Sequence, residues 1–370
     1  MEALKKNKYL ICALLFALLN MGAIFFIFGF QEYGDTSQYI QTINWFQGEE
    51  SEPSVWRVIR PIGSLIAVPF EFLGEGAGLI VQNAIFYLLC AFLIFKITEL
   101  IYHNKRQAFF ASLFFVTATP VIETGLAYLT DTGGWFFFLL SIFLTLLYFK
   151  NKNEKLITIN GFLSGAGVLL KESGGLGAPF FGLMILLSRN GIKEKIFKII
   201  RFGVFFLTPI VIVQFLMFKY FNFSSLDLFH TSVGFADPGE SWLIASLRYL
   251  GQFFRIMGIL WPLILIGIWR EWQEKNWERI KIFLALLPSS FVFLLWHPAA
   301  GARTVFFFAP LGILFATHGL SFLENKLGKK RGTLMIVLLV LAILTLNYWF
   351  CWLNPDYSFF EIIAEFLGIL

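Results

Sequence analysis

The chain has 370 residues, of which 58% are hydrophobic and only 14% are charged, with a net charge of +5 and 47 phenylalanines. Soluble domains average about 45–50% apolar and about 25% charged residues, so the composition excludes an ordinary soluble protein and predicts an integral membrane protein. Membrane topology accounts for the basic residues, so we do not expect a nucleic acid partner.

The first element is a long apolar run at residues 9–30, preceded by MEALKKNK. A signal peptide has an apolar core of about 7–15 residues and a small-residue cleavage site, and neither feature fits this run. The sequence therefore predicts a first membrane helix.

Further apolar runs follow along the chain. A spanning helix needs roughly 20 apolar residues. By that rule we predict an all-α polytopic membrane protein with about eleven spans, forming a single transmembrane domain over residues 1–370 without a soluble domain. The expected spans are 9–30, 77–101, 108–128, 132–150, 156–170, 174–188, 198–219, 251–269, 281–296, 304–322 and 333–353.

The basic residues give the orientation. With the N-terminus inside, 22 of the 29 Lys and Arg residues fall on the cytoplasmic side, as the positive-inside rule requires. Seven do not: Arg57, Arg60, Lys171, Lys219, Arg248, Arg255 and Arg303. The outer side also receives 16 of the 24 acidic residues. Because ionisable groups at membrane depth are costly and usually functional, we expect a site on the outer face.

Two substantial outer loops are predicted, at 31–76 and 220–250. The first contains TSQYIQTINWF, whose apolar spacing predicts an amphipathic helix at the membrane surface. Residues 60–74 are too short and too interrupted by proline to span, which favours an interfacial or re-entrant piece. The tail, NPDYSFFEIIAEFLGIL, is expected to form another amphipathic helix on the outer surface.

Two aspartates are the candidate catalytic residues. Asp35 follows the first span as a helix begins, so it is either a helix N-cap or a general base at the membrane surface. Asp131, in LTDTGG, lies between two closely linked spans and is either an N-cap or a carboxylate able to approach Asp35.

Cationic and polar residues on the same side are candidates for substrate binding. Lys171 and Glu172 interrupt an apolar hairpin, and they either pair with each other or contact a phosphate. Arginine suits phosphate better because its guanidinium can bond two oxygens, although snorkelling to lipid headgroups is the alternative for each arginine. The candidate set is Arg57, Arg60, Lys171, Glu172, His297, Arg303 and Tyr39, with His230 as a weaker candidate.

No metal or cofactor is expected from the motifs. Cys12, Cys90 and Cys351 lie in apolar runs and match no ligand spacing. There is no Walker loop, dinucleotide fingerprint, HExxH or GxSxG sequence.

Five motifs, in order and on one predicted side, resemble a known family. They are GDTSQY in the first outer loop, RPIGSL at the broken helix, LTDTGG, LLKESGGLGAP and GARTVFFFAP. Together they look like the polytopic GT-C glycosyltransferases that use polyprenyl-phosphate sugars, including mannosyltransferase-like and aminoarabinose-transferase-like members. The resemblance covers most of residues 9–320.

The resemblance implies an inverting sugar transfer on the outer face of a bacterial cytoplasmic membrane. Asp35 would deprotonate the acceptor hydroxyl, and Arg60, Lys171 and Arg303 would hold the lipid phosphate as it leaves. The partners would be a polyprenyl-phosphate sugar, a lipid-linked or small glycan acceptor and membrane lipid.

The sequence departs from the family in two ways. Many members have paired acidic residues in the first loop, whereas Thr36 follows Asp35, so no metal is assigned. Many also end in a soluble domain, which is not expected here. Two alternatives remain: a transporter or flippase for a lipid-linked glycan, which would favour charges deep within the spans, and a polytopic glycan polymerase.

Overall fold

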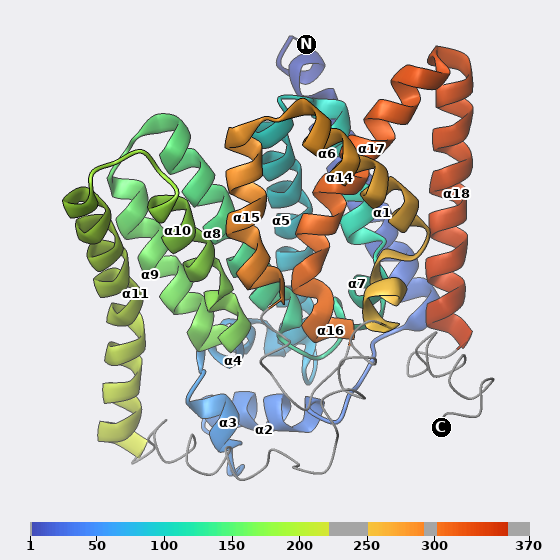
Figure 1. Ribbon diagram of the computed structural model, residues 1–370. Helices are drawn as coiled ribbons and strands as arrows, with labels where there is room; N and C mark the ends of the chain where they lie inside the picture. The colour runs from blue at the N-terminus through green and yellow to red at the C-terminus, as the bar shows by residue number, and fades with distance from the viewer. Residues whose placement is uncertain (1, 222–250, 292–301, 354–370) are drawn as a thin grey trace, which may run out of the picture. The chain divides into compact units, whose positions relative to one another are not determined.

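A computed structural model describes residues 2–221, 251–291 and 302–353. Every regular element in these ranges is a helix, which confirms an all-α polytopic protein (Figure 1). The expected tail helix and nearly all of the second outer loop, from residue 222 onward, lie outside the described residues, as does His230.

Seven helices among the described residues are long and apolar enough to cross a membrane. They are Asn7–Phe28, Ala77–Tyr102, Asp131–Asn151, Ile192–Tyr220, Gly251–Glu274, Phe306–Leu327 and Lys330–Trp352. The remaining four expected spans correspond to shorter helices, so the count of eleven is not confirmed. The expected span at 108–128 is wrong as a continuous helix, because α6 (Lys105–Val116) ends before Pro120, which lies in the first turn of α7 (Thr119–Thr124).

The chain divides into two compact units. One comprises residues 1–22, 94–123 and 237–370, and the other residues 23–93 and 124–236. The long helices α1 (Glu2–Phe28) and α5 (Ala77–Tyr102) contribute one part to each unit. We call the unit that contains residues 1–22 and 237–370 the terminal unit, and the other the central unit. The candidate site lies within the central unit.

The central unit combines long helices with short ones at one end. Its elements are α2 (Thr36–Phe46), α3 (Val55–Val58), α4 (Ile62–Ala67), η1 (Val68–Leu73), α8 (Asp131–Asn151), α9 (Lys155–Leu170), η2 (Glu172–Leu176), α10 (Gly177–Leu186) and α11 (Ile192–Phe221). In Figure 1, α2 lies across the ends of the long helices rather than alongside them. The expected helix in the first outer loop is thus present, and α4 and η1 form the short broken piece expected at 60–74.

Glycines bring the long helices of the central unit into close contact. A Cβ atom on Gly161 would lie 2.6 Å from the carbonyl oxygen of Phe202, and one on Gly165 would lie 2.0 Å from that of Phe206. The α9 and α11 backbones therefore touch along a face of small residues, as is common between membrane helices. This contact fixes α9, whose end leads directly to Lys171.

The beginning of α5 is fixed by a side chain from the short segment before it. The Glu71 carboxylate accepts hydrogen bonds from the backbone N–H groups of Gly76 and Gly78, at 2.7 and 2.9 Å. These N–H groups at the start of α5 have no partner within the helix, and a carboxylate there also complements the helix dipole. These two hydrogen bonds connect η1 to α5 and hold the short helices in place at this end.

The terminal unit contains α6, α7, η3 (Gly258–Leu260), α14 (Trp261–Glu274), α15 (Trp277–Phe291), α16 (Ala302–Val305), η5 (Phe306–Phe308), α17 (Ala309–Leu327) and α18 (Lys329–Leu353). A buried ion pair in this unit joins Arg255 to Glu123, both side chains being 7% exposed. Arg255 is one of the seven cations that topology does not explain, and this ion pair accounts for it. Cys90 and Cys351 are buried and Cys12 is exposed, and all three are free thiols.

Candidate active site

The candidate site forms where five segments of the central unit meet. They are the start of α2, the short helix α3, the segment 124–130, the first turn of α8 and the link from α9 to η2. Gly63 of α4 makes this convergence possible, since a Cβ there would lie 2.8 Å from the side chain of Thr130 and 3.7 Å from the carbonyl oxygen of Leu170.

Asp35 is at the N-cap position of α2, but its side chain makes no capping hydrogen bond. Instead, Asp35 Oδ2 lies 3.3 Å from Arg57 Nη2. The local hydrogen bond runs from the Tyr33 N–H to Thr36 Oγ1, at 2.9 Å. The Asp35 carboxylate is therefore available to the site, with its side chain 39% exposed beside an arginine that is 11% exposed.

Tyr39 is the buried centre of the site. It lies one turn after Asp35 and is only 4% exposed. Its hydroxyl accepts a hydrogen bond from Arg57 Nη1 at 2.9 Å and lies 2.7 Å from Thr130 Oγ1. The Arg57 guanidinium also lies over the Tyr39 ring, 4.0 Å from its centroid. Burial raises the pKa of the Tyr39 phenol, so it stays protonated.

Tyr39 was a sequence candidate for substrate binding, and the structure shows which neighbours it contacts. Its ring packs in a core cluster with Ile43, Ala67 and Leu129, and its hydroxyl is occupied by two neighbours. It therefore holds Arg57 in place and joins α2 to the segment that precedes Asp131.

Asp131 is the first residue of α8, and its side chain is 4% exposed. Lys171 Nζ donates to Asp131 Oδ1 at 2.5 Å. The sequence alternative that Lys171 pairs with Glu172 is therefore wrong. Gly134 permits this approach, because a Cβ there would lie 2.6 Å from Ser173 Oγ and 3.5 Å from Lys171 Cβ. The second glycine of LTDTGG thus creates the space that lets Lys171 approach the first turn of α8.

Glu172 pairs with Arg60 rather than with its neighbour in sequence. The Arg60 side chain is 18% exposed. Burial, with the nearby charge of Arg57, lowers the pKa of Arg60 to about 10. Arg60 is therefore still a cation at neutral pH, held in a poorly solvated position where its field is strong.

The site thus contains three ion pairs: Asp35–Arg57, Asp131–Lys171 and Glu172–Arg60. The chain of contacts from Arg57 through Tyr39 to Thr130 links the first pair to the second, since Thr130 directly precedes Asp131. Both candidate catalytic carboxylates therefore belong to one hydrogen-bonded assembly.

The structure does not test two of the sequence candidates, His297 and Arg303. His297 lies outside the described residues. Arg303 is in α16 of the terminal unit, where its side chain is partly buried. Their roles in substrate binding remain predictions.

Sequence reasoning missed two residues that shape the site, Thr130 and Asn83. Asn83, fully buried in α5, donates hydrogen bonds to the carbonyl oxygens of Ala127 and Leu129, both at 2.7 Å. These bonds fix the segment that carries Thr130. A buried asparagine six residues into an apolar span was the available signal, since such a group must be hydrogen-bonded.

Comparison with known proteins supports the fold. A family model described as dolichyl-phosphate-mannose-protein mannosyltransferase matches residues 65–216, a range that includes Asp131, Lys171 and Glu172. No curated protein gives a significant match. Among solved structures, the chain is similar to the Archaeoglobus fulgidus oligosaccharyltransferase, crystallised with zinc and sulfate, with a TM-score of 0.61 and 15% identity.

The similarity to the archaeal structure covers 95% of this chain but 53% of the other, so the chain spans about half the length of that protein. At this level of identity the likeness shows a shared fold. The family match over residues 65–216, which is less than half of the chain, and the shared fold both support a relationship to the GT-C superfamily of polytopic membrane glycosyltransferases.

Proposed function

We propose that the protein transfers a sugar from a polyprenyl-phosphate donor to a hydroxyl acceptor, with inversion at the anomeric carbon, on the outer face of the membrane. The observation that carries the proposal is the assembly of three ion pairs around Tyr39. It places an accessible carboxylate beside several cations, which are the groups that such a transfer needs.

Asp35 is the proposed base. Its side chain is the more accessible of the two candidate catalytic carboxylates, 39% against 4% exposed for Asp131. It accepts the proton of the acceptor hydroxyl while the acceptor oxygen forms a bond to the anomeric carbon. Arg57 orients the carboxylate, and Tyr39 holds Arg57.

The cations act on the leaving group. The bond between the anomeric carbon and the phosphate oxygen breaks, and the electron pair stays on the polyprenyl phosphate. Arg60 and Lys171 are the proposed phosphate ligands, because fixed cations in a poorly solvated site stabilise the charge that develops there in the transition state. Asp131 and Glu172 position these two cations.

The proposal includes substrate classes and location. The donor is a lipid-linked sugar and the acceptor a lipid-linked or small glycan, both reached from the membrane, and no cofactor is required. A bacterial cytoplasmic membrane with the N-terminus inside is the proposed location, on the charge distribution of the loops.

The test is transfer of radiolabelled sugar in membranes from a panel of polyprenyl-phosphate donors, comparing the wild type with Asp35→Asn. The substitution keeps the shape and removes the base, so transfer should fall by at least about 100-fold. Glu52→Gln is the matched control, because Glu52 is an exposed carboxylate of the same loop.

Equal transfer by wild type and Asp35→Asn would assign the base elsewhere, with Asp131→Asn as the next variant. Absence of transfer from every donor, with a folded wild-type protein, would contradict the proposed reaction. In that case translocation of a lipid-linked glycan in proteoliposomes would be measured instead.

A further inference from the structure

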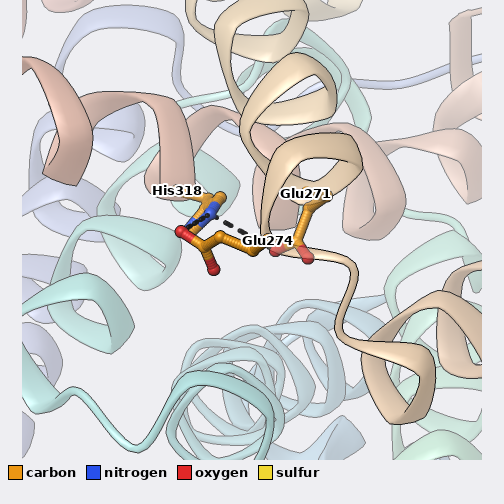
Figure 2. Close-up of side chains that lie close together, drawn as sticks. All are labelled: Glu271, Glu274 and His318. Atoms are coloured by element: carbon orange, nitrogen blue, oxygen red, sulfur yellow. Dashed lines mark ion pairs between the residues drawn. The ribbon is translucent and has the colours of Figure 1, made fainter.

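A second polar cluster lies in the terminal unit, far in sequence from the proposed reaction site. Glu271 and Glu274, one turn apart on α14, face His318 of α17 (Figure 2). These residues are on the predicted cytoplasmic side. In the described part of the chain they are the one group of three or more His, Cys, Asp or Glu residues whose ligand atoms converge closely enough to hold a metal ion.

Close packing of two helices produces the convergence. A Cβ atom on Gly267 would lie 1.9 Å from the carbonyl oxygen of Phe315, and one on Gly319 would lie 2.1 Å from that of Leu263. The α14 and α17 backbones are therefore in contact one turn before Glu271 and one residue after His318. Short carboxylate side chains on α14 can then reach the imidazole on α17.

The orientation of the imidazole is fixed by Tyr102. The two rings are stacked, with centroids 5.1 Å apart and an interplanar angle of 11°. The Tyr102 hydroxyl donates to the carbonyl oxygen of Leu314, one turn before His318 on α17. Such outer support is typical of side chains that bind metals, because it reduces the reorganisation needed on binding.

His318 faces two carboxylates, an arrangement that suits a cation. Nε2 lies 3.5 Å from Glu271 Oε1 and 3.4 Å from Glu274 Oε1. When Nε2 carries a lone pair, it repels these two anionic oxygens, and a proton or a metal ion between them removes the repulsion. With bonds of about 2.0–2.1 Å, two ligands of a tetrahedral zinc ion are about 3.4 Å apart, which matches both separations.

The second oxygen of each carboxylate has a different partner. Arg279 Nε lies 3.3 Å from Glu271 Oε2, and Arg279 Nη2 pairs with Glu274 Oε2. The Oε1 atoms are therefore directed at His318 while the guanidinium holds the Oε2 atoms. Arg270 shares Glu274 Oε1 at 3.0 Å and would have to shift when a metal binds.

We propose that Glu271, Glu274 and His318 bind one divalent transition-metal ion, with zinc as the favoured ion, and that the ion joins α14 to α17. A nitrogen and two carboxylate oxygens suit zinc or manganese better than magnesium or calcium, which prefer all-oxygen sites. Glu271 is 4% exposed and its Oε2 faces Arg279, so a metal bond at Oε1 would give the other oxygen of a buried carboxylate a cationic partner. This inference departs from the expectation that the protein has no metal, and it is independent of the proposed reaction.

The test uses the full chain, purified in detergent with a tag that lacks histidine and without chelators, and analysed for metals by mass spectrometry. We expect about one zinc ion per chain, and in zinc titrations a weakening of at least about 10-fold for Glu271→Gln and for His318→Gln. Glu324→Gln is the matched control, since Glu324 is also on α17 but pairs with Arg106. The control should bind zinc like the wild type.

A second measurement covers the case in which a variant does not fold. The midpoint of thermal unfolding of the wild type should rise with added Zn²⁺ and fall when a chelator is added. No bound metal and no change in this midpoint would mean that a proton on His318 bridges the carboxylates, and the proposal would be wrong. Equal zinc binding by wild type and both site variants would also overturn it, since the metal would then bind elsewhere.

Discussion

Replacing Tyr39 with phenylalanine isolates the role of one hydroxyl group in the assembly. The ring stays, and with it the packing of the core cluster around Ile43 and the contact with the Arg57 guanidinium at 4.0 Å. What is lost is the oxygen that lies 2.9 Å from Arg57 Nη1 and 2.7 Å from Thr130 Oγ1. Thr130 is fully buried, so water cannot replace the lost partner without rearrangement.

The expected cost follows from the two hydrogen bonds. A neutral hydrogen bond contributes about 0.5–1.5 kcal/mol, and one to a charged group about 1.5–3 kcal/mol. Tyr39→Phe should therefore reduce the free energy of unfolding by about 2–4 kcal/mol. Without the hydroxyl, Arg57 Nη1 would lose this hydrogen bond, and the Asp35 carboxylate beside Arg57 would lose its fixed position. Sugar transfer should therefore fall by about 100-fold.

The measurements are denaturant unfolding in detergent and transfer of labelled sugar, both beside the wild type. Tyr33→Phe is the control, since its hydroxyl donates to a residue close in sequence, Gln31 Oε1, at 3.0 Å. If Tyr39→Phe unfolded within about 0.5 kcal/mol of the wild type and transferred sugar equally well, the hydroxyl would not connect the two ion pairs, and this reasoning would fail.

Three further variants test the rest of the site. Lys171→Met leaves the Asp131 carboxylate buried without this cation and should reduce the free energy of unfolding by about 3–5 kcal/mol. In a double-mutant cycle, adding Asp131→Asn should recover much of that loss. Gly134→Ala places a Cβ 2.6 Å from Ser173 Oγ and should lower transfer, whereas Gly182→Ala, with open space around it, should leave transfer unchanged. Arg60→Met should lower transfer by a similar factor at every pH from about 6 to about 9, leaving the shape of the pH profile unchanged, because an arginine whose pKa is about 10 is charged throughout that range. A shifted pH profile in that variant would show that Arg60 titrates during the reaction.

The composition and motif order were enough to predict an all-α membrane fold, the GT-C relationship and a surface helix that begins after Asp35. The pairing within the site could not be predicted in the same way. Lys171 and Glu172 are adjacent in sequence, and only the approach of α8 and of the segment carrying Arg60 decides which carboxylate each cation meets. Such choices depend on long-range packing, which local spacing does not encode.

The number of membrane-spanning helices could not be predicted from the sequence either. An apolar run such as 108–128 has the composition of one span, but Pro120 divides it into α6 and α7. The cluster of Glu271, Glu274 and His318 was missed for a related reason. Both glutamates are more than 40 positions from His318, and backbone contact at two glycines brings the two helices together.

The three ion pairs have a consequence for the order of events in the proposed reaction. Three carboxylates and three cations make the site electrically balanced before any substrate binds. A sugar linked through a phosphodiester brings one further negative charge, which the cations must share with their carboxylates. The polyprenyl phosphate that remains after transfer carries up to two negative charges, and the same cations attract it more strongly. Release of the spent lipid, rather than bond breaking, is therefore expected to limit turnover, and added polyprenyl phosphate should inhibit in competition with the donor.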